Sequence, residues 1–290
     1  FGTSEPFTVD RPNLSKDYLA GNAPEEWLPV RGDDFFEEHQ ITFSQDEVTA
    51  IDRDAKAIHA AGKQHAYDVL VLATGAKPRT LPTPGADKPH VHTLRTLSDA
   101  QNIVGAVEEG AKTAVIIGAG FIGLEAAASL TRQGLSVRVV APDEVPLERV
   151  MGGQVGSFVQ SIHERNGVTF HLGHTVDTIE DGSVTLDDGT THDADLVVMG
   201  VGVIPNTSLA EDAGLTVDRG VEVDAMLRTS DSSIYAAGDI AKFPYGGEKV
   251  RVEHWVVAQR QGQAVARDIV GRGKPFTETP FFWSHHWDVG

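Results

Sequence analysis

The chain has 290 residues, with 42 acidic side chains against 24 lysines and arginines, so its formal net charge is −18. That charge repels phosphate backbones and argues against nucleic-acid binding, and it indicates either a solvated acidic surface or a salt-adapted host. Cysteine is absent, which excludes disulfides, thiolate metal sites and a redox-active dithiol. No apolar run is long enough to cross a membrane and no signal peptide is recognisable, so the predicted location is the cytoplasm.

The first third of the chain predicts loops followed by one buried strand and one helix. Residues 1–30 contain several prolines and little periodicity. Residues 51–58 are weakly strand-like. Residues 67–75 form an apolar run that ends at a glycine, which is typical of a buried strand. Residues 98–109 predict a helix with Ser98 as its N-cap.

Residues 113–140 carry the most informative pattern, TAVIIGAGFIGLEAAASLTRQGLSVRVV. A β-branched run leads into Gly118, Gly120 and Gly123, and an Ala/Leu-rich helix and a second apolar run follow. This is the strand–turn–helix–strand context of a dinucleotide-binding GxGxxG motif. Gly118 allows the tight turn, Gly120 lets the backbone approach a pyrophosphate, and Gly123 lets the helix pack on the strand. The alternative is a tight turn without a ligand.

The remaining sequence predicts further alternation of helices and strands. Helices are expected over residues 156–166 and 254–270, and strands over residues 168–172, 175–179 and 183–186. Residues 195–200 repeat the pattern of an acid, an apolar run and a glycine, which predicts a second buried strand. Residues 280–283 indicate extended chain.

Several motifs together resemble one family of flavoproteins. The matching stretches are RPNLSK (11–16), ATGAKPR (73–79), LRTLSDA (94–100), GAGFIGLE (118–125), residues 195–206 and YAAGD (235–239). As a set they resemble the FAD-dependent pyridine nucleotide-disulfide oxidoreductase superfamily, and within it the NADH:ferredoxin and NADH:rubredoxin reductases. Residues 253–255 and 258–263 favour the apoptosis-inducing-factor-like members of that group.

The resemblance implies an α/β fold with two Rossmann-like dinucleotide-binding domains of the three-layer ββα type. It places the first part of the FAD domain at residues 1–105, the NAD(P) domain at 106–227, the second part of the FAD domain at 228–280 and the start of a C-terminal interface domain at 281–290. The NAD(P) domain is thus inserted in the FAD domain. The family's first βαβ unit and most of its interface domain have no counterpart, so the chain resembles a protein truncated at both ends.

The implied activity is that of an oxidoreductase that passes a hydride from NAD(P)H to FAD and then electrons to a ferredoxin, a rubredoxin or a Rieske-type protein. A homodimer is possible within this family. One alternative is an apoptosis-inducing-factor-like NADH sensor with little turnover. Another is a flavin-free fragment that binds only NAD.

The resemblance also assigns site residues. Lys16 and Glu125 are the expected catalytic pair at the flavin, although a solvated lysine and an acid favoured by the helix dipole are the simpler alternatives. No metal site is expected, because the 12 histidines lack ligand spacing and a Rieske cluster needs cysteines. The expected cofactor-binding residues are Arg11, Lys16, Ala73, Thr74, Gly75, Arg79, Gly118, Gly120, Ile122, Gly123, Glu125, Gly202, Gly238, Asp239, Glu253, His254 and Trp255. Trp283 matches a tryptophan near the redox-partner surface.

The choice between NADH and NADPH is less clear from the sequence. A dinucleotide-binding unit expects an acid about 20 residues after its glycines to bind the ribose 2′-OH. Ala141 stands at that place, and Asp143 and Glu144 follow as possible substitutes. Arg132 and Arg138 are candidates to attract a 2′-phosphate, so NADH is only slightly favoured.

Overall fold

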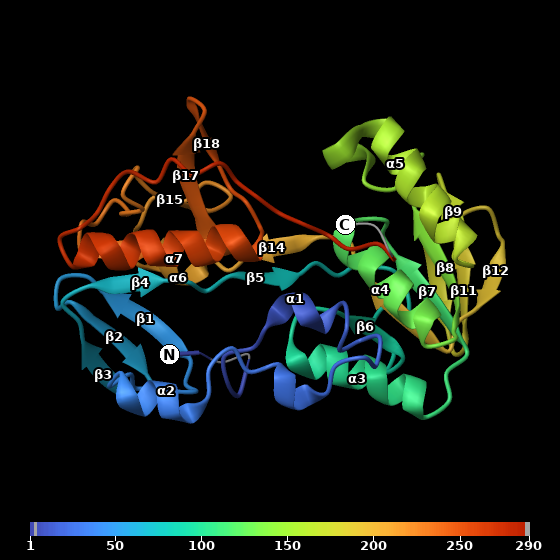
Figure 1. The fold of residues 1–290 in the computed structure, drawn as a ribbon, viewed down its shortest axis with the longest axis horizontal. Coiled ribbons are helices and arrows are strands. Elements are labelled where there is room, and N and C mark those ends of the chain that lie inside the picture. Colours follow the sequence, from blue (N-terminus) through green and yellow to red (C-terminus); the bar gives the residue numbers. More distant parts are fainter. Residues whose placement is uncertain (3–4, 288–290) are drawn as a thin grey trace. The chain divides into compact units, whose positions relative to one another are not determined.

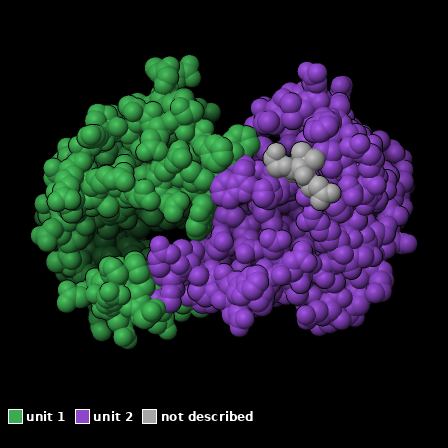
Figure 2. Space-filling view, in the orientation of Figure 1, with its two compact units in different colours: residues 1–6, 33–77, 204–282 green, residues 7–32, 78–203, 283–290 purple. Residues whose placement is uncertain are grey.

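The computed structural model describes residues 1–2 and 5–287, which form two compact units (Figure 2). Unit 1 consists of Asp33–Lys77 and Ile204–Phe282 with the described part of Phe1–Pro6. Unit 2 consists of Phe7–Gly32 and Pro78–Val203 with the described part of the segment from Trp283. The main segment of unit 2 is therefore inserted between the two main segments of unit 1.

A five-stranded parallel sheet forms the centre of unit 2, in the order β6-β13-β7-β8-β9 (Figure 1). The central strands β13 and β7 are apolar and almost fully buried, because a parallel sheet covered on both faces exposes neither to water, whereas the edge strands β6 and β9 include threonine and histidine. The strands are β6 (Val91–Thr93), β7 (Thr113–Ile117), β8 (Ser136–Ala141), β9 (Thr169–Leu172) and β13 (Leu196–Met199).

Strand β7 shows why this sheet is buried on both sides. Side chains alternate between faces along a strand. Ala114 and Ile116 pack with the cluster that includes helices α3 (Leu97–Glu108) and α4 (Phe121–Arg132). Val115 and Ile117 pack against the antiparallel sheet on the other face. That sheet consists of β10 (Val176–Glu180), β11 (Ser183–Leu186) and β12 (Thr191–Asp193). Unit 2 thus has the predicted three layers, with α5 (Glu148–Arg165) following β8.

Unit 1 is built on a pair of parallel strands, β4 (Leu70–Leu72) and β16 (Ile234–Ala236), together with helix α7 (Trp255–Ile269). Its antiparallel sheet contains β1 (Val48–Asp52), β2 (Ala57–Ala60) and β3 (Lys63–Ala66). A third sheet contains β15 (Val221–Glu222), β17 (Ala241–Tyr245) and β18 (Glu248–Val250). Shorter helices are α2 (Asp33–Glu38), α6 (Ser208–Asp212) and the 3₁₀ turn η2 (Gly238–Ile240).

The remaining elements lie near the chain's passages between units. Helix α1 (Arg11–Leu14) and the 3₁₀ turn η1 (Glu25–Trp27) belong to the N-terminal segment of unit 2, as the proline-rich sequence predicts. Strands β5 (Ala76–Pro78) and β14 (Val203–Pro205) pair where the chain passes from one unit to the other and back. Within residues 1–2 and 5–287, no helix is both long and apolar enough to span a bilayer.

Four sequence predictions of local structure are wrong in detail. Helix α3 is capped by Thr96 through a reciprocal bond with Asp99, not by Ser98. Helix α5 begins at Glu148, well before residue 156, with a kink at Gly152. Residues 51–58 contain the turn between β1 and β2 rather than one strand. The strand at 67–75 shrinks to Leu70–Leu72, in which Val71 is 39% exposed.

The compact units do not coincide with the predicted domain boundaries. Residues 7–32 and 78–105 belong to unit 2, and residues 204–227 belong to unit 1. Compactness does not report which cofactor a segment contacts, so the assignment of residues to FAD and NAD(P) domains stays a prediction. Residues 288–290 of the predicted interface segment lie outside the described residues.

Candidate functional site

The glycine turn between β7 and α4 has the shape of a phosphate cradle. Gly118 has a φ of +108°, and a Cβ there would lie 2.5 Å from the Gly200 carbonyl oxygen. A Cβ on Gly123 would lie 2.1 Å from the Gly118 carbonyl oxygen, so only glycine lets the helix pack this closely. A Cβ on Gly120 would meet nothing nearer than 3.9 Å, which leaves that side of the turn open. The residues present therefore fit a pyrophosphate at the amino end of α4.

Glu125 lies near the start of α4 and is buried, with 4% of its side chain exposed. Its Oε2 accepts hydrogen bonds from Ser15 Oγ at 2.5 Å and from Lys16 Nζ at 2.7 Å. Its Oε1 accepts one from Ser284 Oγ at 2.6 Å. A buried carboxylate is stable only with such partners, and here they come from two distant parts of the sequence, residues 15–16 and residue 284. The predicted Lys16–Glu125 ion pair is thus confirmed, while its role at a flavin stays a prediction.

The segment that carries Lys16 is held against α4. Ser129 Oγ donates to the carbonyl oxygen of Ser15 at 2.9 Å, and Gln133 Nε2 donates to that of Leu19 at 2.8 Å. Lys16 Nζ also donates to the Pro12 carbonyl oxygen at 3.2 Å, and 19% of the lysine side chain remains exposed. A third acceptor, Ser15 Oγ, lies 3.5 Å from the same nitrogen, so the ammonium is held by three oxygen atoms.

In unit 1, the predicted residues Ala73, Thr74 and Gly75 follow the end of β4. Thr74 Oγ1 donates to the carbonyl oxygen of Asn206 at 2.7 Å, and Asn206 Nδ2 donates back to the Thr74 carbonyl oxygen at 2.9 Å. The Asn206 backbone N–H donates to the carbonyl oxygen of Gly75, whose φ is +65°. The asparagine was visible in the sequence, within the motif at residues 195–206, but was not assigned to the site.

The Gly-Asp pair after β16 is fixed by α7 and by an arginine. Gly238 has a φ of +78°, and its N–H donates to Oε1 of the fully buried Gln261 at 2.7 Å. Arg251 Nη1 donates to the Asp239 carbonyl oxygen at 3.0 Å and to Glu253 Oε1 at 2.5 Å. Sequence reasoning missed Gln261 and Arg251, since only the tertiary contacts single them out. The backbone of Gly238 is thus held in a conformation that glycine adopts readily, which suits close approach by a cofactor.

The other predicted cofactor residues are distributed over both units. His254 caps α7 through Nδ1, which accepts from the N–H of Val256, and Trp255 is the first residue of that helix. In unit 2, the Arg79 N–H donates to the Gly202 carbonyl oxygen at 2.9 Å. Arg11 begins α1, and Ile122 presents an exposed side chain at the start of α4. The structure therefore brings together Lys16 with Glu125, Arg79 with Gly202, and the Asp239 backbone with Glu253.

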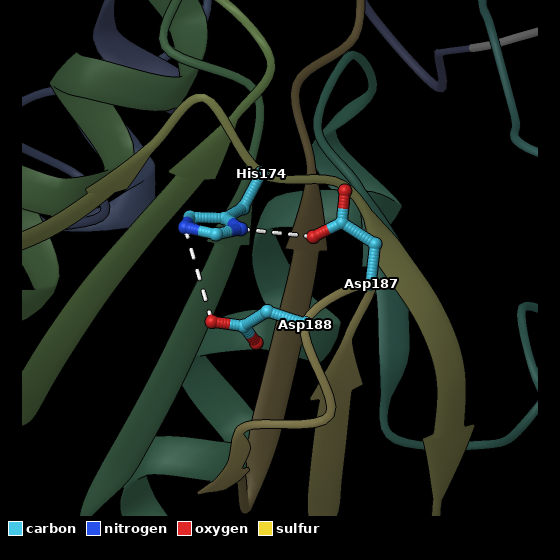
Figure 3. A group of neighbouring side chains, drawn as sticks. All are labelled: His174, Asp187 and Asp188. Carbon is cyan, nitrogen blue, oxygen red and sulfur yellow. Dashed lines mark hydrogen bonds and ion pairs between the residues drawn. The ribbon is translucent and has the colours of Figure 1, made fainter.

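One further polar group lies on the surface of unit 2 (Figure 3). His174 Nδ1 contacts Asp187 Oδ1 at 2.9 Å, and His174 Nε2 lies 3.9 Å from Asp188 Oδ2. The hydrogen bond from His174 holds the pKa of Asp187 below its usual range. Among the described residues, these three make up the one group of three or more histidine and carboxylate side chains whose ligand atoms lie close together. The bonds join the chain before β10 to the turn after β11, which is a structural role.

Comparison with known proteins identifies the family. A model of the pyridine nucleotide-disulphide oxidoreductases matches residues 2–262. The chain belongs to this family. It is 39% identical to a rhodocoxin reductase of Rhodococcus erythropolis over 287 residues, which are 96% of this chain and 67% of the relative. A crystal structure of a ferredoxin reductase from Rhodopseudomonas palustris superposes with a TM-score of 0.94 at 38% identity, over 98% of this chain and 72% of that one.

A second solved structure with high similarity is the covalent complex of putidaredoxin reductase with putidaredoxin. It superposes with a TM-score of 0.92 at 36% identity, over 99% of this chain and 72% of that one. The predicted superfamily, the α/β fold and the assignment as an oxidoreductase are therefore confirmed. As a pyridine nucleotide-disulphide oxidoreductase, the chain is expected to use the open face of its glycine turn for the pyridine nucleotide.

Proposed function

We propose that this chain passes a hydride from NADH to FAD and then electrons to a small one-electron carrier of the ferredoxin, rubredoxin or Rieske type. The observation that carries the proposal is the Lys16–Glu125 ion pair. Its buried member, Glu125, lies on α4 two residues after Gly123, the last glycine of the turn. Three similar proteins support the carrier class: a rhodocoxin reductase, a ferredoxin reductase, and a putidaredoxin reductase joined to putidaredoxin. A cytoplasmic location and a homodimer stay predictions.

On the nucleotide side, the residues of unit 2 have separate tasks. The open face at Gly120 admits the pyrophosphate, and the amino end of α4 stabilises its charge. Gly202, whose φ is +95°, lies in a backbone turn tied to Arg79 and leaves space beside the nicotinamide half. The task of these groups is to fix the position of the nucleotide, because a hydride moves only between well-aligned atoms.

In unit 1, the family resemblance makes Ala73–Gly75, Gly238, Asp239 and Glu253–Trp255 the flavin candidates. In unit 2, it makes Arg11, Lys16 and Arg79 the candidates. Bound FAD accepts two electrons as a hydride and releases them singly. The positive charge of Lys16 would stabilise negative charge that develops during reduction, and Glu125 keeps the ammonium in one orientation.

The test begins with the absorbance spectrum of the purified chain, supplemented with FAD. Flavin bands should appear, and anaerobic NADH should bleach them at a rate that saturates with NADH. Reoxidation should then be fast with ferricyanide and with a purified ferredoxin or rubredoxin. Failure to bind flavin, or a flavin that NADH does not reduce, contradicts the proposal. A long-lived charge-transfer complex with slow reoxidation supports the NADH-sensing alternative instead.

A further inference from the structure

The loop that follows β8 lies at the nucleotide end of the parallel sheet. In such sheets the carboxyl ends of the strands meet at one edge, where the ligand binds. β8 ends at Ala141, and the N–H of Leu147 donates to the carbonyl oxygen of Ala119 at 3.0 Å. Ala119 is part of the glycine turn itself. Leu147 adopts a left-handed backbone conformation, with a φ of 57°, at this contact. The loop at 142–147 is therefore attached directly to the phosphate cradle.

This loop carries an ion pair at the place where the ribose carboxylate is missing. Asp143 lies two residues after Ala141, and its Oδ1 accepts from Arg149 Nε at 2.9 Å. The Asp143 backbone is fixed as well, because its carbonyl oxygen accepts from the N–H of Gly173 at 3.2 Å. The side chain of Asp143 is 25% exposed, whereas that of Arg149 is 80% exposed. The aspartate is thus the more enclosed partner of the pair, and the arginine lies mostly in solvent.

The charge around this pair is negative. Glu144 lies beside Asp143, and Glu148 Oε2 accepts from the Glu144 N–H at 3.1 Å. Residues 141–149 therefore carry three carboxylates and one guanidinium. A phosphate dianion brought to this loop meets a net negative charge, and the guanidinium that would bind it is already engaged.

The two arginines that the sequence suggested for a 2′-phosphate lie elsewhere in unit 2. The guanidinium of Arg132 stacks 5.1 Å from the centroid of the Trp287 ring, at the end of α4 opposite the cradle. Arg138 is the third residue of β8, about 10 Å before the strand ends. Burial lowers the pKa values of His171 and His192, and the nearby charge of Arg138 lowers them further. Arg149 is therefore the arginine best placed for a 2′-phosphate.

We infer that Asp143 makes this chain select NADH over NADPH, because its carboxylate repels a 2′-phosphate and holds Arg149 away from it. The inference rests on the proposed function only in that the glycine turn binds a pyridine nucleotide. Without the Asp143 carboxylate, Arg149 is released and its planar fork of donors becomes a ligand for the phosphate.

The experiment compares two nucleotides that differ by the 2′-phosphate alone, 5′-AMP and 2′,5′-ADP, by calorimetric titration of the whole chain at low salt. The variants are Asp143→Ser, whose side chain is too short to reach Arg149, and the double variant Asp143→Ser/Arg149→Ala. Glu144→Gln is the matched control, since it removes the same charge from the same loop but breaks no contact with Arg149. Thermal melts verify that each variant is folded.

The wild-type chain should bind 5′-AMP at least tenfold more tightly than 2′,5′-ADP. Asp143→Ser should reduce that preference at least tenfold, because Arg149 becomes free to bind the 2′-phosphate. The double variant lacks this arginine, so most of the gain in affinity for 2′,5′-ADP should be lost. Glu144→Gln should change the preference less than threefold. The inference is overturned if Asp143→Ser keeps the wild-type preference, or if Glu144→Gln reduces the preference as much as Asp143→Ser does. Either result leaves the proposed function standing. If neither nucleotide binds to the wild type or to any of the variants, the nucleotide site is overturned, and both proposals with it.

Discussion

At the scale of single residues, Glu125 depends most on its partners. Its carboxylate is buried and is compensated by one ammonium and two hydroxyls. Removing a partner from a buried charge costs more than the pair contributes, because the remaining charge is left without compensation. This asymmetry allows the pair to be tested without any cofactor.

Replacing Lys16 by Met should lower the free energy of unfolding by about 2 kcal/mol, since Ser15 and Ser284 still donate to the carboxylate. The double variant Lys16→Met/Glu125→Gln should recover at least half of that loss, because it removes the buried charge as well. Urea unfolding of the wild type, the single variants Lys16→Met and Glu125→Gln and the double variant completes the double-mutant cycle. Strictly additive losses would show that the two side chains are not coupled.

Ser284 contributes to the same pair from the far end of the chain. The variant Ser284→Ala removes one hydrogen bond to a buried carboxylate, so Glu125 and Lys16 become less well oriented. We expect flavin reduction by NADH to slow about tenfold, the equivalent of about 1.4 kcal/mol, with little change in the Kd for NADH. The control is Ser284→Thr, which keeps the hydroxyl. A loss in NADH affinity instead of in the reduction rate would contradict a positioning role.

At the scale of elements, the turn between β7 and α4 separates steric from ligand-binding glycines. Gly123→Ala places a methyl group 2.1 Å from the Gly118 carbonyl oxygen, and we expect it to destabilise the chain by about 1–3 kcal/mol. Gly120→Ala should be stable, because its φ is −84° and its Cβ meets no close atom, yet it should weaken NAD⁺ binding at least tenfold. Thermal melts and titrations with NAD⁺ measure both. Tight binding by Gly120→Ala would place the phosphate elsewhere.

Helix α5 and the C-terminal segment are joined by a buried histidine pair, with His163 Nε2 and His286 Nδ1 3.2 Å apart. Burial lowers the pKa of His163 from 6.5 to about 3, so the unfolded chain binds the proton more readily than the folded one. Stability is therefore greatest above pH 6.5 and falls as the pH drops toward 3, by at most about 1.4 kcal/mol per pH unit for this histidine.

His163→Phe should be somewhat less stable at pH 7.5, because it leaves His286 without its partner, but its stability should fall less between pH 6.5 and pH 5. Denaturant unfolding over this range measures the slope. The control variant is His59→Phe, which makes the same replacement at an exposed histidine on β2. Equal slopes in His163→Phe and the wild type would assign the acid sensitivity to other groups.

The sequence predicted the βαβ unit well because every signal there is local. The period of the strand, the glycine spacing and the length of the helix all agree, and β7, α4 and β8 lie where the pattern placed them. The prediction from sequence failed where the first or last residue of a helix depends on tertiary partners. Gly152 and Gly153 interrupt the pattern of α5, and Pro146 precedes it, although the structure accommodates a helix from Glu148 with a kink. Local propensity likewise did not reveal that Val71 is partly exposed.

The candidate site was predicted unevenly for a similar reason. Motif residues such as Lys16 and Glu125 were identified from a family pattern, and the structure confirms that they meet. Ser284, Gln261 and Arg149 carry no motif of their own, because a hydroxyl, an amide or a surface arginine becomes informative only when its partner is known. Their assignment to the site needed three-dimensional contacts.

At the scale of the whole molecule, the net charge of −18 bears on the encounter with an electron carrier. Ferredoxin-type carriers of acidic composition are repelled by such a field, and salt screens the repulsion, since the Debye length falls from about 30 Å at 0.01 M to about 8 Å at 0.15 M ionic strength. The rate constant for electron transfer to an acidic carrier should therefore rise roughly threefold between these salt concentrations. Stopped-flow reoxidation of the reduced protein measures it, and a basic carrier, whose rate should fall with salt, is the control. A rate that falls with salt for the acidic carrier would mean that a local basic surface dominates docking despite the overall charge.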